Sequence, residues 1–236
     1  MDLMQSDLIT RNEAGVAEGR PSTSGEATTS NNWKLPRKLR SCIYEMVLRV
    51  PHPIYLFQET DDLVEAFAPE KPAQWHALLH VSKKINFEAS AVLYRTNKFS
   101  LLEMSPKEVV LLRHFLNGIG PRNASSISYF CVSFPYIESR PENCQIRADS
   151  AEMLAVLEEK CTGLKTLELV IHSKNCGWFT CDNANTTQYV LKMLSHIDVK
   201  LKGIVSIEQV CIRVHSGALQ FSISDHMRHL GWKVLA

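Results

Sequence analysis

Long hydrophobic runs are missing from this sequence of 236 residues. Its apolar segments extend over only a few residues, whereas a membrane-spanning helix needs roughly 20. The N-terminus begins with acidic and polar residues, including Asp2 and Asp7, instead of the basic stretch and apolar segment of a secretory signal. We therefore expect an intracellular soluble protein, cytoplasmic or nuclear, with no membrane association.

Glycine-rich phosphate loops are also missing. The ten glycines are dispersed, and none of them builds a GxGxxG or GxxxxGK motif. The formal net charge is only +1, which gives no overall attraction to nucleic acid. One short basic stretch, from Trp33 to Arg40, could touch phosphates, but it lacks base-reading residues. We predict neither nucleotide chemistry nor nucleic-acid binding.

The seven cysteines have no regular spacing, and their number is odd. This usage is typical of free thiols in a reducing compartment and not of a disulfide framework. Cys176 and Cys181, with His172 and His196, could be interpreted as a zinc site, since thiolate and imidazole suit that metal. However, the gap between the cysteines is at the edge of ligand spacing, and no second pair follows. We expect no metal.

The residues near the C-terminus include a cysteine that could act as a nucleophile, histidines that could act as a base, and an aspartate that could orient the base. They are Cys211, His215, Asp225, His226 and His229. No catalytic sequence motif surrounds Cys211, and histidines in such a segment are commonly surface residues. We therefore predict no enzymatic activity and no cofactor.

Composition divides the chain into three parts. Residues 1–32 are rich in Ser, Thr, Gly, Glu and Asn, so they cannot bury enough apolar surface to fold, and we predict a disordered tail. Residues 33–99 show helical periodicity. Residues 100–236 alternate between helical and strand patterns. A helical module followed by an α/β domain is the expected organisation.

The helical part contains two periodic segments. Pro36 suits the first turn of a helix, and apolar residues recur at helical spacing up to Val50. Arg37, Arg40 and Glu45 should lie on the opposite, solvated face. A long loop is expected over residues 51–72, with at most a short strand or turn. Periodicity resumes over 75–93, as one bent helix or two abutting ones, and a strand should follow over 98–104.

The last part is a mixed α/β structure. Strands are predicted over 127–134, 164–171 and 207–214, each preceded by a helix, with a period of roughly 40 residues. Strands joined by helices should lie parallel in one sheet. Leu164 to Leu169 comes close to the LxxLxL pattern, so an irregular, leucine-rich-repeat-like helix-strand repeat is expected. A further strand is predicted over 219–223.

The helical part resembles a known family. Residues 35–48 read LPRKLRSCIYEMVL, residues 77–89 read ALLHVSKKINFEA, and residues 92–99 read VLYRTNKF. These segments resemble the F-box-like module of many filamentous-fungal proteins, which follows the patterns LPxELRxxIYxxxL and ALLxVSRxIxxEAxxxLYxxNxF.

This resemblance implies a docking protein. In F-box proteins the Leu-Pro start and the following apolar positions bind the adaptor subunit of an SCF-type cullin-RING ubiquitin ligase, and the downstream domain selects the substrate. The candidates carried over for adaptor binding are Leu35, Pro36, Leu39, Ile43 and Val47. Two alternatives remain open: that these residues form the module's own core, and that the protein is a non-catalytic scaffold or regulator without adaptor binding.

Overall fold

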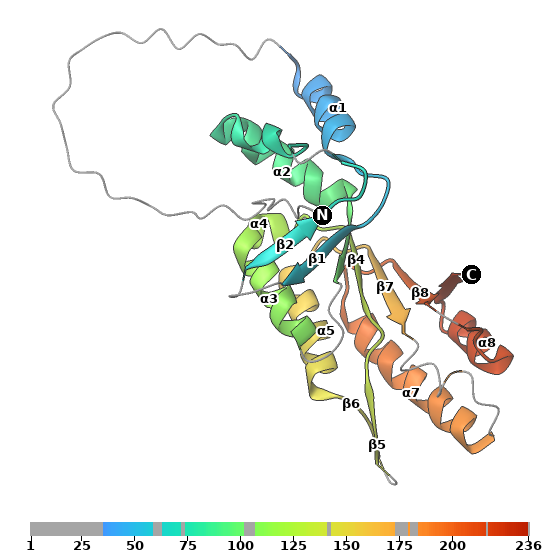
Figure 1. The fold of residues 1–236 in the computed structure, drawn as a ribbon. Coiled ribbons are helices and arrows are strands. Elements are labelled where there is room, and N and C mark those ends of the chain that lie inside the picture. Colours follow the sequence, from blue (N-terminus) through green and yellow to red (C-terminus); the bar gives the residue numbers. More distant parts are fainter. Residues whose placement is uncertain are drawn as a thin grey trace, which may run out of the picture.

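A seven-stranded β-sheet organises the chain (Figure 1). This computed structural model describes residues 35–58, 63–71, 74–101, 107–140, 143–172, 179, 184–215 and 217–235. The strands lie in the order β2-β1-β3-β4-β7-β8-β9. Their bounds are β1 Ile54–Gln58, β2 Val64–Phe67, β3 Lys98–Leu101, β4 Tyr129–Ser133, β7 Thr166–Ile171, β8 Gln209–Val214 and β9 Lys233–Leu235.

Neighbouring strands pair in parallel, apart from β1 and β2, which are antiparallel. From β3 onward, a helix joins each strand to the neighbour that follows it in the sheet. These helices are α3 Lys107–Ile119, α5 Ala148–Lys160, α7 Ala184–Gly203 and α8 Phe221–His229. Because such crossovers are right-handed, the helices fall on one face of the sheet. Accordingly, α3, α5, α7 and α8 contact one another in that order (Figure 1).

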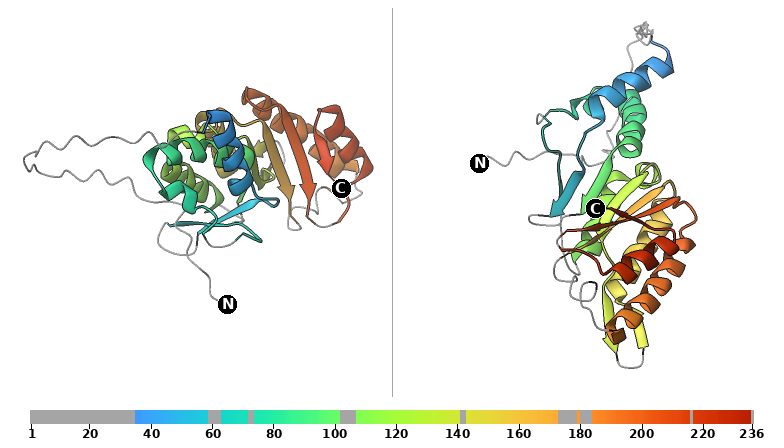
Figure 2. Two further views of the ribbon diagram at one scale, coloured as in Figure 1. Left: turned by 90° about the horizontal axis from the view of Figure 1, so that it is seen from above. Right: turned by 90° about the vertical axis from the view of Figure 1, so that its right-hand side faces the viewer.

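Two further helices pack together at one end of the sheet (Figure 2). They are α1 Arg37–Leu48 and α2 Lys83–Thr96, and the short 3-10 helix η1 Ala77–His80 precedes α2. The Ser82 hydroxyl caps α2 by accepting a hydrogen bond from the Ile85 amide at 3.2 Å. The periodic run over 75–93 is therefore two abutting helices, one of the two arrangements predicted.

The core lies between the sheet and its helices. Strand residues that point toward the helices, such as Phe130, Leu167 and Ile212, are fully buried. Phe99, Phe115 and Phe130 form an aromatic cluster with Tyr94, with ring centroids 5.5 to 6.4 Å apart. Because successive strand residues point to opposite faces, the residues between these apolar positions project from the other side of the sheet.

The prediction of a mixed α/β structure with a mostly parallel sheet is confirmed. The region expected to be a long loop is more ordered than predicted, because it contains β1 and β2. The strand predicted over 219–223 is wrong. Helix α8 begins at Phe221, and its buried residues Ile223 and Met227 are one helical turn apart.

Smaller elements complete the fold. Helix α4 Pro121–Ala124 follows Gly120, whose φ of 78° favours glycine. Strands β5 Ile137–Arg140 and β6 Asn143–Ile146 pair in a separate antiparallel sheet.

The seven-stranded sheet continues across residue 99, where a boundary was expected, since β1 and β2 precede that residue. The predicted tail over 1–32 lies outside the described residues. No helix in the described part of the chain is long and apolar enough to cross a membrane.

Candidate functional site

Helix α1 leaves a row of apolar side chains exposed to solvent. Leu35 just before the helix and Leu39, Ile43 and Val47 within it are 48%, 51%, 42% and 39% exposed, and Pro36 is also exposed. These are the five residues proposed from sequence for adaptor binding. Met46 extends the row and is 80% exposed. We call these six residues the α1 apolar face. None of them belongs to the protein's own core.

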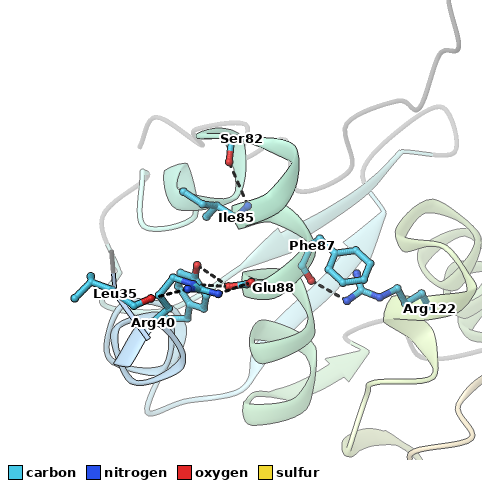
Figure 3. Close-up of polar contacts among 8 residues, drawn as sticks. Leu35, Arg40, Ser82, Ile85, Phe87, Glu88 and Arg122 are labelled. Carbon is cyan, nitrogen blue, oxygen red and sulfur yellow. Dashed lines mark hydrogen bonds and ion pairs between the residues drawn. The ribbon is translucent and has the colours of Figure 1, made fainter. Parts of the chain in front are cut away.

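The opposite face of α1 packs against α2. Tyr44 and Leu48 are buried there, and Arg40 forms a two-pronged ion pair with Glu88 of α2 (Figure 3). Arg40 Nε donates to one carboxylate oxygen at 2.8 Å and Nη2 donates to the other at 2.7 Å. The side chain of Arg40 is only 13% exposed. The prediction that Arg40 lies on a solvated face is therefore wrong, because its guanidinium has a carboxylate partner on the neighbouring helix.

Two more hydrogen bonds complete the Arg40 contact. The Tyr44 hydroxyl donates to Glu88 Oε2 at 3.2 Å, and Arg40 Nη1 donates to the Leu35 carbonyl at 2.7 Å. Hydrogen bonds from Arg40 lower the pKa of the Glu88 carboxyl, so this group stays ionised at neutral pH. Arg40 thus ties α2 to the chain segment where the α1 apolar face begins.

Asn97 fixes the other end of α1. Its side-chain oxygen accepts from the Val50 amide at 2.8 Å, and its side-chain nitrogen donates to the carbonyls of Leu48 and Leu93 at 2.9 Å. Asn97 is 1% exposed. The sequence pattern included this asparagine, but the prediction gave it no role. In the structure it satisfies backbone groups that the end of α1 leaves without helical partners.

Exposed cations also lie on α1 and directly after it. Arg37, Lys38 and Arg49 are exposed on α1 or directly after it, and Lys71 Nζ donates to the Val47 carbonyl at 3.2 Å. Helix α1 therefore offers a partner an apolar row together with basic residues, although Glu45 on the same helix is also exposed. Trp33, the first residue of the basic stretch considered for nucleic acid, lies outside the described residues.

A second polar arrangement lies on the face of the sheet opposite the core. We define this outer face by Lys98 of β3, Tyr129 of β4, Glu168 of β7, Arg213 of β8 and Lys233 of β9. Glu168 is buried, and it accepts hydrogen bonds from the Tyr129 hydroxyl and from Arg213 Nε. Burial alone would raise the pKa of Glu168, but the hydrogen bonds from Arg213 and Tyr129 outweigh burial and lower it.

Cys131 and Cys211 lie on either side of Glu168 in the sheet register. Burial raises the pKa of Cys131 to about 12 and also raises the pKa of Cys211. Both thiols therefore remain protonated at neutral pH, which makes them weak nucleophiles.

Of the histidines considered with Cys211, His226 lies 3.4 Å from the Ser195 hydroxyl on α7, and His229 forms an exposed pair with Asp225.

The zinc hypothesis receives no support from the described residues. Cys176 and Cys181 lie outside them, and His172 lies beside His215 with ring centroids 5.8 Å apart. Burial is the main cause that lowers the pKa of His172. Within the described part of the chain, no group of three or more His, Cys, Asp or Glu residues could hold a metal ion.

A small polar pocket opens at the carboxyl end of β4. It is lined by Glu108, Ser133, Tyr136, Arg147 and Asp149, among others. Glu108 accepts a hydrogen bond from the Ser133 amide at 2.7 Å, and Arg147 binds Asp149 through two hydrogen bonds. Burial raises the pKa of Glu108 to about 7. Because these groups bind one another, we interpret the pocket as structural.

No family model, curated protein or solved structure matches this chain.

Proposed function

We propose that this chain is a non-catalytic interaction protein that binds a partner through the α1 apolar face. The observation that carries this proposal is the exposure of Leu35, Leu39, Ile43 and Val47. Leu39, Ile43 and Val47 are spaced four apart, so they form a single ridge along the helix, and Leu35 lies just before it. Soluble proteins rarely leave a contiguous apolar ridge in water unless it is an interaction site.

The chemistry of the ridge suits a helix-in-groove contact. In this mode, apolar anchors one turn apart enter a hydrophobic groove together, and their removal from water supplies the binding energy. The exposed cations Arg37, Lys38 and Arg49 in this segment favour a groove with acidic residues at its rim. The partner should therefore present an apolar groove flanked by carboxylates.

The way α1 is held supports the same role. The contact of Arg40 with Glu88 and the hydrogen bonds of Asn97 hold its two ends against α2. A helix that is already folded and fixed loses little conformational entropy when it binds. Contacts with α2 thus hold one face of α1 in place, and the other face is available to a partner.

More specifically, we propose that the partner is the adaptor subunit of an SCF-type cullin-RING ubiquitin ligase and that the chain is a substrate receptor. Support comes from the sequence resemblance to F-box-like modules and from the exposure of all five carried-over residues. In this proposal residues 33–99 act as the F-box-like module, and residues 100–236, which carry strands β4, β7, β8 and β9 of the shared sheet, select substrates.

The test is co-purification of the chain with the host's F-box-binding adaptor. Wild type is compared with a Leu39→Asp, Ile43→Asp double variant, with folding checked by circular dichroism. The matched control is Val199→Asp, Val205→Asp, which places the same charges at exposed apolar positions 70% and 95% accessible elsewhere. The proposal expects binding by wild type and by the control, and its loss in the folded α1 variant.

Other outcomes would overturn the adaptor assignment. If wild type does not bind the adaptor, the chain is a scaffold or regulator of another kind. If the α1 variant still binds, the α1 apolar face is not the docking surface. Light scattering across a concentration series shows whether this face joins two copies of the chain, in which case the double variant would be monomeric where wild type is dimeric.

A further inference from the structure

We infer that His172 and His215 form a surface site for a divalent transition-metal ion of the Zn²⁺ class. The two imidazoles supply two ligands, and water fills the remaining positions. This pair differs from the zinc set considered from the sequence, since only His172 belongs to both. The inference goes beyond the proposed function, because it does not depend on which partner α1 binds.

The sheet register places the two histidines side by side. Ile171 of β7 pairs with Val214 of the parallel strand β8, so the residue that follows each of them is a histidine at the same level. The ladder continues to this point, because the His215 amide donates to the Ile171 carbonyl at 3.0 Å. Both side chains project to the side opposite the buried Ile171, which is the outer face of the sheet.

The distance between the two rings fits one shared ion. Their centroids are 5.8 Å apart, and their planes are inclined by 35°. Because a zinc–nitrogen bond is about 2.0–2.1 Å long, an ion bound to one nitrogen of each ring lies about 3.2 Å from each centroid, which allows centroid separations up to about 6.5 Å. The observed separation lies within this limit, so a single ion can reach both rings.

The ring nitrogens of this pair are available to a metal. Among the described residues, no hydrogen bond or ion pair involves either imidazole. His215 is exposed and His172 is half-buried, so ions can reach the pair from solvent. Burial, and to a smaller extent the charge of His215, lowers the pKa of His172. Its ring is therefore neutral at pH 7 and keeps a lone pair for coordination.

The surroundings of the pair favour a metal that prefers nitrogen ligands. Within the described part of the chain, no third His, Cys, Asp or Glu side chain joins the two histidines. Imidazole suits Zn²⁺, Ni²⁺ and Cu²⁺, whereas Mg²⁺ and Ca²⁺ prefer oxygen ligands. The positive charge of Arg213, two residues before His215, is offset by its ion pair with Glu168.

The test is titration of the full chain with ZnCl₂, followed by calorimetry and by NMR of the isotopically labelled protein. We expect saturable binding with shifts of the His172 and His215 ring signals, and no binding of MgCl₂. His172→Gln and His215→Gln, tested separately, should each weaken Zn²⁺ binding by at least about tenfold, because even the loss of a residue that only orients a metal ligand typically costs 10–100-fold in affinity.

The control is His196→Gln, which removes an exposed histidine from α7. Circular dichroism checks the folding of all three variants, and the exposed His215→Gln variant decides if His172→Gln does not fold. Equal weakening in the control would mean that Zn²⁺ binds histidines in general, and the inference would be wrong. Absence of Zn²⁺ binding, or saturable shifts only elsewhere in the chain, would also overturn it.

Discussion

The side chain of Asn97 forms hydrogen bonds with both Leu48, the last residue of α1, and Val50, two residues later. It donates to the Leu48 carbonyl at 2.9 Å and accepts from the Val50 amide at 2.8 Å, and all these groups are buried. One residue at the end of α2 thus fixes the end of α1, which carries the proposed docking surface.

Replacing Asn97 with alanine should destabilise the protein by about 2–4 kcal/mol. The change leaves the Val50 amide and the Leu48 carbonyl buried without partners, and each such group costs about 1–3 kcal/mol. Urea unfolding followed by circular dichroism measures the effect. Asn117→Ala is the control, since Asn117 is exposed and, among the described residues, its side chain binds the flexible Lys160 side chain. A loss as small as that of the control would contradict the role given to Asn97.

Glu88→Gln should lower the free energy of unfolding at pH 7 and have little effect in acid. The lowered pKa of Glu88 means that the charged pair with Arg40 stabilises the fold above the ordinary carboxyl pKa of 4.5. This contribution is lost as the pH falls through the still lower pKa in the folded state. Urea unfolding of both proteins at pH 7 and pH 3 measures the difference. The idea fails if the gap between variant and wild type is the same at both pH values.

Glu108 should show the opposite pH dependence. Its pKa is raised by burial to about 7, so the folded protein retains a proton that the unfolded chain releases near pH 4.5. Stability contributed by the protonated group is present below pH 4.5 and is lost as the pH rises to 7, by on the order of 3 kcal/mol. Glu108→Gln should therefore be more stable than wild type at pH 8. Urea midpoints between pH 5 and 8 test this, and a steeper decline in the variant would refute it.

Met46 should contribute to partner binding without contributing to stability. It is 80% exposed on the α1 apolar face, although it was not among the five residues first proposed for adaptor contact. We expect Met46→Asp to change the unfolding free energy by less than about 0.5 kcal/mol, as is usual at exposed positions. The same change should weaken adaptor capture in the co-purification assay, whereas Val199→Asp should leave it unchanged.

Helix α8 can be checked by comparing two of its residues. Ile223 is fully buried and Phe221 is 78% exposed. Ile223→Ala should cost about 2–5 kcal/mol, as expected for an isoleucine removed from a packed core. Phe221→Ala should be close to neutral. If residues 219–223 formed a strand, both positions would lie on the same face, and their alanine variants would have similar costs.

The elements built from local patterns could be read from the sequence. The helix after Pro36 and the strands near residues 129, 166 and 209 follow from apolar periodicity, and their parallel pairing follows from the helices between them. The strand predicted over 219–223 failed because a short apolar run has the same composition in a strand and in an amphipathic helix. Packing of Ile223 and Met227 decided in favour of the helix.

Five residues of the α1 apolar face, all except Met46, were also named at the level of sequence, from the resemblance to F-box-like modules. Their exposure was decided by tertiary structure. Arg40, which the local pattern assigned to solvent, turns toward α2 because Glu88 lies there, 48 residues further along the chain. The outer face of the sheet arises in the same way from strands distant in sequence. Periodicity determines which side chains share a face, but only contacts between distant segments determine which face is covered.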